Sequence, residues 1–291
     1  MISIIITALK EPKTIGRAIE KILENKIKNS EILVVAPDDE TLNEAKKYSS
    51  KDKSIKIIKD AGKGKPAALN LAVNKSKGDT LVLTDGDVYI NEKSISLLLS
   101  YFKDKKVGAV SGRPVSISSK NTRYGYWAFL LSEIANERRK KAIKFKKRIF
   151  CSGYLFAIKR ELFPHLDEEL LSEDGFISHQ VYKKGYQIAY SEKSEVYIKY
   201  PSNFKDWIIQ KRRSTGGYNQ IKKLINIEIR SFKKESLGAF QLFRYISNAK
   251  EFFWLIELYL SRIYLWFKIY QDVNIKKRKR EEIWKRVEST K

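Results

Sequence analysis

The sequence predicts an α/β fold in which helices flank a mostly parallel, Rossmann-like central sheet. In the first half of the chain, short apolar runs rich in β-branched residues alternate with segments whose apolar residues recur at helical spacing. Such alternation is typical of βαβ units, which build parallel sheets. The chain has 291 residues, 43% of them hydrophobic, which is enough for a large domain with a sizeable core.

The expected elements follow in chain order. The first half predicts a strand at 3–9, a helix at 14–24, a strand at 31–36, a helix at 39–49, a strand at 55–58, a helix at 65–76 and a strand at 80–84. The middle is less regular and predicts strands at 107–110 and 154–158, with helices at 122–148, 173–183 and 204–223. No internal repeat or low-complexity linker interrupts them.

The last strand of the first half ends at Asp85-Gly86-Asp87. Open parallel sheets bind ligands beyond the carboxyl ends of their strands, which is where these residues fall. Two carboxylates one residue apart can hold a hard divalent cation such as Mn²⁺ or Mg²⁺, which prefers carboxylate oxygen together with substrate phosphate. The glycine between them allows a close approach of the backbone to a ligand. The structural alternative is an ordinary turn or a solvated cap.

Three further motifs carry charges suited to phosphate or hydroxyl chemistry. Lys65 follows a glycine at a predicted helix start, a favourable place for a phosphate. Glu173 and Asp174 begin another predicted helix, where Asp174 can act as a general base or where both residues cap the helix. Arg213, in a polar run that starts at Gln210, can donate paired hydrogen bonds to a diphosphate. For Lys65 and for the Arg213 run, the alternative is a solvated surface.

As an ordered set, these motifs resemble glycosyltransferase family 2, whose members have the GT-A fold. The resemblance covers about residues 2–218. The matched segments are the first strand followed by an acidic residue (Thr7 and Glu11), a base-binding aspartate (Asp38 or Asp39), Lys65 to Asn70, Asp85 to Asp87, Cys151 to Gly153, Glu173 with Asp174, and Gln210 with Arg213.

The resemblance implies an inverting, metal-dependent transfer of a sugar from a nucleoside diphosphate sugar, with a UDP-sugar favoured, to an acceptor hydroxyl or phosphate. Asp87, with Asp85 nearby, would hold Mn²⁺ or Mg²⁺. Asp174 would take the acceptor proton and Glu173 would orient the acceptor. The residues implied to contact the donor are Thr7, Glu11, Asp38, Lys65, Asp85, Gln210 and Arg213.

Two departures from the family pattern matter. The tryptophan that follows the family's Gln-x-x-Arg motif is Ser214 here, which argues against chain polymerisation. Where the family has paired aspartates directly after the second strand, this chain has Ala36-Pro37 followed by Asp38-Asp39. The contact to the nucleotide base is therefore shifted or different.

The C-terminal part differs in character, and we expect a catalytic domain at 1–225 followed by a helical, basic tail at 226–291. Residues 237–270 are dense in aromatic and aliphatic side chains. Glu257, Arg262 and Lys268 interrupt this run, and each charge costs about 2.5–3.5 kcal/mol at the middle of a bilayer. We therefore expect either an amphipathic helix in the membrane interface or a helix packed on the catalytic domain.

The net charge of +24 points to anionic partners. Basic clusters at 138–148 and 276–280 suit an anionic membrane surface, which predicts a peripheral enzyme acting on a lipid-linked or glycan acceptor. The single cysteine and the absence of a signal-peptide pattern predict a cytoplasmic protein at the inner face of the cell membrane. The simpler explanation of the basic clusters is solubility.

Two rival functions use some of the same features. A sugar nucleotidyltransferase would share the parallel sheet and the acidic metal ligands, but its glycine-rich N-terminal signature is missing from residues 7–11. A nucleic-acid-binding protein would explain the charge. However, the sequence contains no recognised nucleic-acid-binding motif, and the carboxylate pairs would repel a polyanion.

Overall fold

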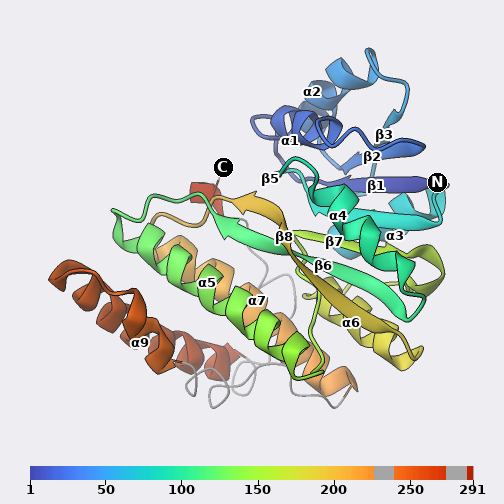
Figure 1. Cartoon of the computed structure of the whole chain (residues 1–291). Helices are drawn as coiled ribbons and strands as arrows, with labels where there is room; N and C mark the ends of the chain where they lie inside the picture. Colours follow the sequence, from blue (N-terminus) through green and yellow to red (C-terminus); the bar gives the residue numbers. More distant parts are fainter. Residues whose placement is uncertain (226–238, 273–286, 291) are drawn as a thin grey trace.

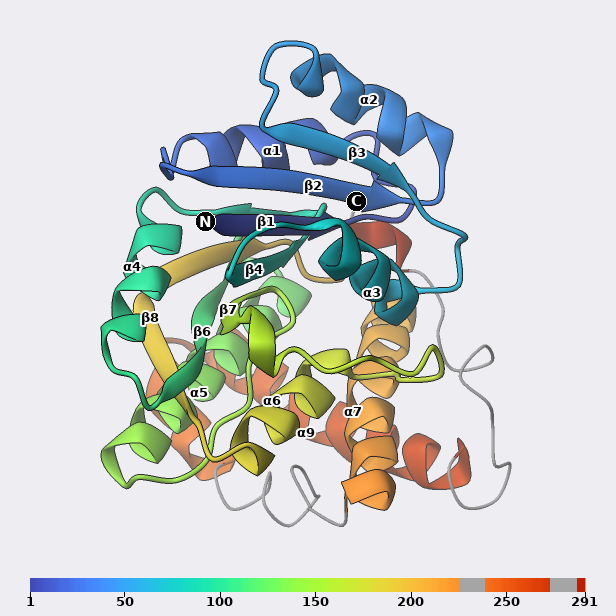
Figure 2. The ribbon, with the colours of Figure 1, turned by 90° about the vertical axis from the view of Figure 1, so that its right-hand side faces the viewer.

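The computed structural model describes residues 1–225, 239–272 and 287–290, and it confirms the predicted α/β architecture. The described strands form an eight-stranded sheet in the order β3-β2-β1-β4-β7-β6-β8-β5 (Figures 1 and 2). Four of its seven pairings are parallel, namely β1–β2, β1–β4, β2–β3 and β6–β8. The sheet is therefore mostly parallel, as expected.

The first half of the chain follows the predicted alternation closely. Its elements are β1 (Ile2–Thr7), α1 (Ile15–Leu23), β2 (Ser30–Ala36), α2 (Asp39–Ser49), β3 (Ile55–Lys59), α3 (Lys65–Lys75) and β4 (Thr80–Asp85). Successive side chains of a strand point to opposite faces of a sheet. In β1, Ile4 and Ile6 accordingly pack with α1 and α2, whereas Ile5 packs with α3 on the other face.

The second half of the sheet departs from the sequence expectation. Its elements are β5 (Val88–Ile90), α4 (Ser94–Ser100), β6 (Val107–Ser116), α5 (Arg123–Lys144), β7 (Leu155–Lys159), α6 (Glu173–Lys183), β8 (Gln187–Ile198) and α7 (Phe204–Ile225). The sequence did not predict β5, α4 or β8, and it predicted only the first four residues of β6. Charged residues such as Glu192 and Lys193 interrupt the apolar run of β8, so the pattern does not resemble a buried strand.

A third cluster of buried side chains lies outside the sheet, where α5, α7 and α9 (Ala249–Tyr270) meet. Trp127 of α5 and Trp207 of α7 are nearly fully buried there, and their ring centroids are 5.3 Å apart. The indole N–H of Trp127 donates a 2.7 Å hydrogen bond to the carbonyl oxygen of Trp254 in α9. One face of α9 therefore packs on the rest of the chain, on the side of α5 and α7 that lies away from the sheet (Figure 1).

The aromatic-rich tail is not one helix. A short 3₁₀ segment at Ala239–Tyr245 precedes α9, and Asn248 caps α9 by accepting a hydrogen bond from the backbone N–H of Glu251. The basic run at 276–280 and the residues at 226–238 lie outside the described residues. The expected boundary between a catalytic domain at 1–225 and a tail at 226–291 stays a prediction.

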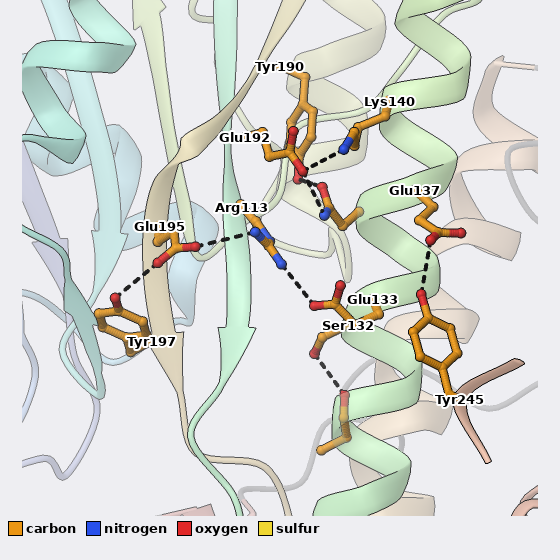
Figure 3. Close-up of polar contacts among 12 residues, drawn as sticks. Arg113, Ser132, Glu133, Glu137, Lys140, Tyr190, Glu192, Glu195, Tyr197 and Tyr245 are labelled. Atoms are coloured by element: carbon orange, nitrogen blue, oxygen red, sulfur yellow. Dashed lines mark hydrogen bonds and ion pairs between the residues drawn. The ribbon is translucent and has the colours of Figure 1, made fainter. Parts of the chain in front are cut away.

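A network of hydrogen bonds and ion pairs connects α5 to the second half of the sheet (Figure 3). Arg113 of β6 lies between two carboxylates, 2.9 Å from Glu133 of α5 and 3.3 Å from Glu195 of β8. Further along α5, Asn136 and Lys140 both donate to Glu192 of β8. These contacts hold the helix on which α9 packs in a fixed place relative to the sheet.

Candidate functional site

The carboxyl ends of β1 and β4 form the floor of the candidate site. Thr7 and Asp85 are register partners, and the hydroxyl of Thr7 donates a 3.2 Å hydrogen bond to a carboxylate oxygen of Asp85. Gly86 follows Asp85 and donates its N–H to the carbonyl oxygen of Thr7. A Cβ at Gly86 would lie 2.8 Å from the Cβ of Ala8, so only glycine lets the two strand ends approach this closely.

Lys65 begins α3 and reaches into the same place. Its ammonium lies 2.6 Å from a carboxylate oxygen of Asp85 and 3.0 Å from one of Glu173, and it donates a 3.2 Å hydrogen bond to the carbonyl oxygen of Gly153. Pro66 stands in the first turn of the helix, where a missing N–H costs nothing. The lysine thus brings together residues that lie 20 and 108 positions away along the chain.

Charge and burial oppose one another in this cluster. Burial raises the pKa of Asp85, and the negative charge of the neighbouring Asp87 acts in the same direction against the attraction of Lys65. For Glu173, burial also disfavours the charged form, but Lys65 outweighs it and holds the pKa of this carboxyl below its usual range. Both carboxylates raise the pKa of Lys65 above its ordinary value despite burial, so the lysine is a fixed positive charge.

Asp174 is held in place by three donors. One of its oxygens accepts hydrogen bonds from the Ser172 hydroxyl at 2.6 Å and from the Gly175 N–H at 2.8 Å, and the other accepts from the Gly153 N–H at 3.1 Å. Burial raises the pKa of Asp174, and the charge of Glu173 raises it further. An oriented carboxylate with a raised pKa is suited to proton abstraction, and its helix-terminal position also makes it part of the first turn of α6.

Asp85 and Asp87 are the candidate metal ligands. Among the described residues, no group of three or more His, Cys, Asp or Glu side chains forms a site that could hold a metal on its own. Mg²⁺ is commonly bound through one or two carboxylates, with substrate phosphates and waters completing the shell. A carboxylate pair at the carboxyl end of β4 fits that mode, in which the donor diphosphate supplies the missing oxygens.

The helix α7 contributes Gln210 and Arg213. Gln210 is only 7% exposed, and its side-chain oxygen is one of three buried side-chain polar atoms without a hydrogen-bond partner in the described part of the chain. The positive charge of Arg213 lowers the pKa of Glu173, which places the guanidinium within electrostatic range of the carboxylate cluster. Arg213 is therefore near the cluster, while the donor-binding roles of Gln210 and Arg213 stay predictions.

Two of the predicted donor-binding residues have local structural partners. Asp38 is the N-cap residue of α2, and one of its carboxylate oxygens accepts hydrogen bonds from the N–H and the hydroxyl of Thr41. Its other oxygen accepts a 2.7 Å hydrogen bond from the N–H of Lys10. Glu11 is 5% exposed and accepts a hydrogen bond from the Thr14 hydroxyl. Both residues shape the loop after β1.

Two further residues at this edge of the sheet were not predicted from the sequence. Tyr154 lies close enough to Asp85, Asp87 and Arg213 for their charges to affect its phenol, and burial raises its pKa. Asp60 follows β3 and faces Asp38, and burial raises the pKa of its carboxyl. The available signal for Asp60 was its position after the carboxyl end of β3, because ligands of open α/β sheets gather there. Tyr154 precedes β7, and only the antiparallel pairing of β7 with β4 brings it to the same edge of the sheet.

Comparison with known proteins identifies the family of the chain. The family model described as glycosyl transferase family 2 matches residues 3–167. The chain is 29% identical over 201 residues to a probable glycosyltransferase of Bacillus subtilis, YdaM, covering 64% of this chain and 47% of that protein. It is 27% identical over 183 residues to the O-antigen chain rhamnosyltransferase WbaN of Salmonella anatum, covering 57% of this chain and 56% of that protein. The chain thus spans about half the length of these curated relatives.

Solved structures share the fold. The mannosyltransferase PcManGT of Pyrobaculum calidifontis, in complex with GDP-Man and Mn²⁺, superposes with a TM-score of 0.57 at 19% identity, covering 76% of this chain and 64% of that one. Residues 1–349 of TarS from Staphylococcus aureus, in complex with UDP-GlcNAc, superpose with a TM-score of 0.52 at 16% identity, covering 72% and 64%. The expected GT-A architecture is thereby confirmed.

Proposed function

The chain belongs to glycosyl transferase family 2, and we propose that it is an inverting, metal-dependent glycosyltransferase that moves a sugar from a nucleoside diphosphate sugar to an acceptor hydroxyl or phosphate. One observation carries the proposal furthest. Lys65 joins Asp85 of the candidate metal pair to Glu173, and Asp174, the candidate base, is the next residue. A single lysine thus links the part that would hold the leaving group to the part that would activate the acceptor.

In this proposal Asp174 accepts the proton of the acceptor as the acceptor oxygen attacks the anomeric carbon from the face opposite the diphosphate. The bond from the acceptor oxygen to the anomeric carbon forms while the bond to the diphosphate oxygen breaks, which inverts the configuration. Glu173 positions the acceptor. Lys65 and Arg213 supply fixed positive charge for the departing diphosphate, and such preorganised charge is worth about 10²–10³ in rate per group.

Asp87 and Asp85 would hold the divalent cation, Mn²⁺ or Mg²⁺, which when bound neutralises charge on the departing diphosphate. The carboxylate-only donor set supports this assignment, because hard cations prefer oxygen ligands. A Mn²⁺ ion accompanies the donor in the similar mannosyltransferase structure.

We propose a UDP-sugar as the donor, with Thr7, Glu11, Asp38 and Gln210 near the nucleotide. The similar TarS structure binds UDP-GlcNAc, whereas the similar mannosyltransferase binds GDP-Man, so GDP is the competing nucleotide. The unpartnered side-chain oxygen of Gln210 supports a role for this residue in binding a ligand.

We further propose that the acceptor is lipid-linked and that the enzyme acts at the cytoplasmic face of the cell membrane. The net charge of +24 and the basic clusters favour an anionic surface. No helix in the described ranges is both long enough and apolar enough to cross a bilayer. Contact with the membrane through those residues would therefore be peripheral.

Product analysis tests the proposal. The protein is incubated with Mn²⁺, UDP-sugars or GDP-sugars, and a membrane extract that contains lipid-linked saccharides, and the released nucleotide is identified by chromatography. We expect UDP or GDP to be released, at a rate that falls sharply in Asp174→Asn. A parallel incubation supplies nucleoside triphosphates and sugar 1-phosphates in place of the nucleotide-sugars. Release of pyrophosphate there, with no nucleoside diphosphate released in the first incubation, would identify a nucleotidyltransferase and refute the proposal.

A further inference from the structure

The outward side of α9 carries an uncharged apolar stripe. Residues three and four apart lie on one face of a helix, and at this spacing α9 has Phe252, Phe253, Leu260, Ile263, Phe267 and Tyr270. All six side chains are exposed, with Phe253 at 65% and Leu260 at 62%. We call these six residues the outer stripe. At about 1.5 Å per residue it runs for about 27 Å along the helix.

The outer stripe lies opposite the face of α9 that is packed. The buried residues of the helix are Leu255, Leu258, Leu265 and Ile269, and they contact α5 and α7 in the third core cluster. Packing on the rest of the chain therefore does not account for the outer stripe. It is extended by Phe243 of the 3₁₀ segment, whose ring lies 6.4 Å from that of Phe252, and by the 82% exposed Phe240.

Exposed apolar side chains are scattered elsewhere in the described ranges, at positions such as Tyr101, Ile117 and Phe145. Single exposed apolar residues are ordinary, but a contiguous apolar patch on a folded chain marks a surface that binds a protein or a membrane. The outer stripe is such a patch, because all six of its exposed apolar side chains lie on one side of a single helix.

Basic side chains border the outer stripe and lie over aromatic rings. The ammonium of Lys250 is 4.6 Å from the ring centroid of Trp254, and that of Lys268 is 5.5 Å from the ring of Tyr264. Arg244 lies in the same way over Tyr245. Aromatic rings that pack in the acyl boundary, with cations extending to the headgroups, are typical of helices in a membrane interface.

We propose that the outer stripe docks the protein on an anionic bilayer, with α9 lying in the plane of the interface and its basic border against the lipid headgroups. This deepens the proposed function and rests on it where it names the membrane as the place of the acceptor. A second copy of the chain is a poorer occupant, since two chains of net charge +24 repel one another, whereas the same charge attracts anionic lipid.

The helix is joined to the candidate site through α7. Arg212 of α7 forms a partly buried ion pair with Asp272, two residues after the end of α9, while Arg213 of the same helix lies within electrostatic range of Glu173 in the carboxylate cluster. Docking through the outer stripe would therefore hold α7, and the site beside it, at a fixed height above the lipid surface. A lipid-linked acceptor could then enter without leaving the bilayer.

Vesicle co-sedimentation of the full chain tests the inference. The probes are vesicles of phosphatidylcholine alone and vesicles that also contain phosphatidylglycerol. The test variant carries Phe253→Ser, Leu260→Ser and Phe267→Ser, and the matched control carries Tyr101→Ser, Ile117→Ser and Phe145→Ser, which removes exposed apolar side chains elsewhere. Equal circular dichroism spectra and melting temperatures establish that both variants fold.

We expect the wild type and the control to bind phosphatidylglycerol vesicles, and the test variant to bind them at least about tenfold more weakly. Equal binding of the test variant and the wild type, or no binding of the wild type to either vesicle, would overturn the inference. So would a wild-type dimer that the test variant converts to a monomer without any change in vesicle binding. Binding of UDP or GDP in the presence of Mn²⁺ is measured on the same samples without lipid. Its absence beside intact vesicle binding would count against the proposed function alone.

Discussion

The ammonium of Lys65, the first residue of α3, lies 2.6 Å from a carboxylate oxygen of Asp85, the last residue of β4. The positive charge of the lysine thus offsets the negative charge of the aspartate. The sequence predicted that Lys65 would contact the donor diphosphate directly. In the structure it pairs with carboxylates. A divalent cation bound between Asp85 and Asp87 would compete with Lys65 for Asp85, which would free the ammonium to turn toward a phosphate.

Replacing Lys65 by methionine should therefore leave Asp85 and Glu173 as two uncompensated carboxylates. Loss of one partner from a fully buried ion pair costs about 3 kcal/mol. The Lys65 and Asp85 side chains are 27% and 23% exposed, so we expect a smaller loss of stability, measured as a lower melting temperature of Lys65→Met in the absence of metal. Mn²⁺ should raise the melting temperature of this variant more than that of the wild type, because the cation replaces the missing charge. Scanning fluorimetry with and without Mn²⁺ measures both effects, with Lys63→Met as a control at an exposed lysine. Equal responses to Mn²⁺ in Lys65→Met and in the wild type would mean that the metal does not bind at Asp85.

Replacing Asp174 by asparagine should remove the proposed base while keeping the shape of the side chain. We expect turnover to fall by about 10²–10⁴, with donor affinity within a few-fold of the wild type. Steady-state kinetics and a nucleotide titration separate the two effects. Asp104→Asn, at an exposed turn, is the matched control and should leave both unchanged. Near-normal turnover in Asp174→Asn would show that another group takes the proton.

The pH profile should report the same residue. Burial and the charge of Glu173 raise the pKa of Asp174, so its carboxyl stays protonated to a higher pH than an ordinary aspartate, whose pKa is about 3.9. Only the ionised form can accept a proton, and activity is therefore lost as the pH falls through this raised value. We expect the acid limb of kcat to lie above pH 4 and to disappear from the residual activity of Asp174→Asn. An acid limb that persists unchanged in the variant would assign the titration elsewhere.

The ion pair between Arg212 and Asp272 should help to fasten α9 to α7. The Asp272 side chain is 8% exposed, so Arg212→Met would leave a buried negative charge without this partner and should destabilise the fold by about 3 kcal/mol. Arg212→Met combined with Asp272→Leu should recover much of that stability, because no charge is then left behind. Urea unfolding of the three proteins measures the effect. A double variant no more stable than the single one would show that the pair is not what holds the helix.

The first half of the fold could be predicted from the sequence because each of its elements shows one clear hydrophobic pattern, either a continuous apolar run for a strand or apolar residues at helical spacing for a helix. β1 and β2 are continuous apolar runs, and α2 begins and ends as its pattern indicates. β8 was missed because its pairing with β6 and β5 is set by distant segments, while its own residues alternate with charges. The short strand β5 and helix α4 leave too few residues for any period to show.

The candidate site was predictable in its members but not in its contacts. The order of the motifs predicted that Lys65, Asp85, Glu173 and Arg213 belong to one site. In the structure these four residues lie close together. The pairing of Lys65 with carboxylates could not be predicted, because a lysine beside a helix start looks the same whether it faces a phosphate or an acid. Tyr154 was missed for a similar reason, since an aromatic residue beside an apolar strand reads as core.

The proposed function requires that Asp85 and Asp87 hold a divalent cation at the diphosphate of a nucleotide-sugar donor. Calorimetric titration of UDP and GDP, with and without Mn²⁺, into the wild type and Asp87→Ala tests it most directly. We expect one of the two nucleotides, UDP in the first instance, to bind only when Mn²⁺ is present, and we expect this binding to be lost in Asp87→Ala. Binding that is independent of Mn²⁺ and equal in the two proteins, or no binding of either nucleotide to the wild type, would contradict it.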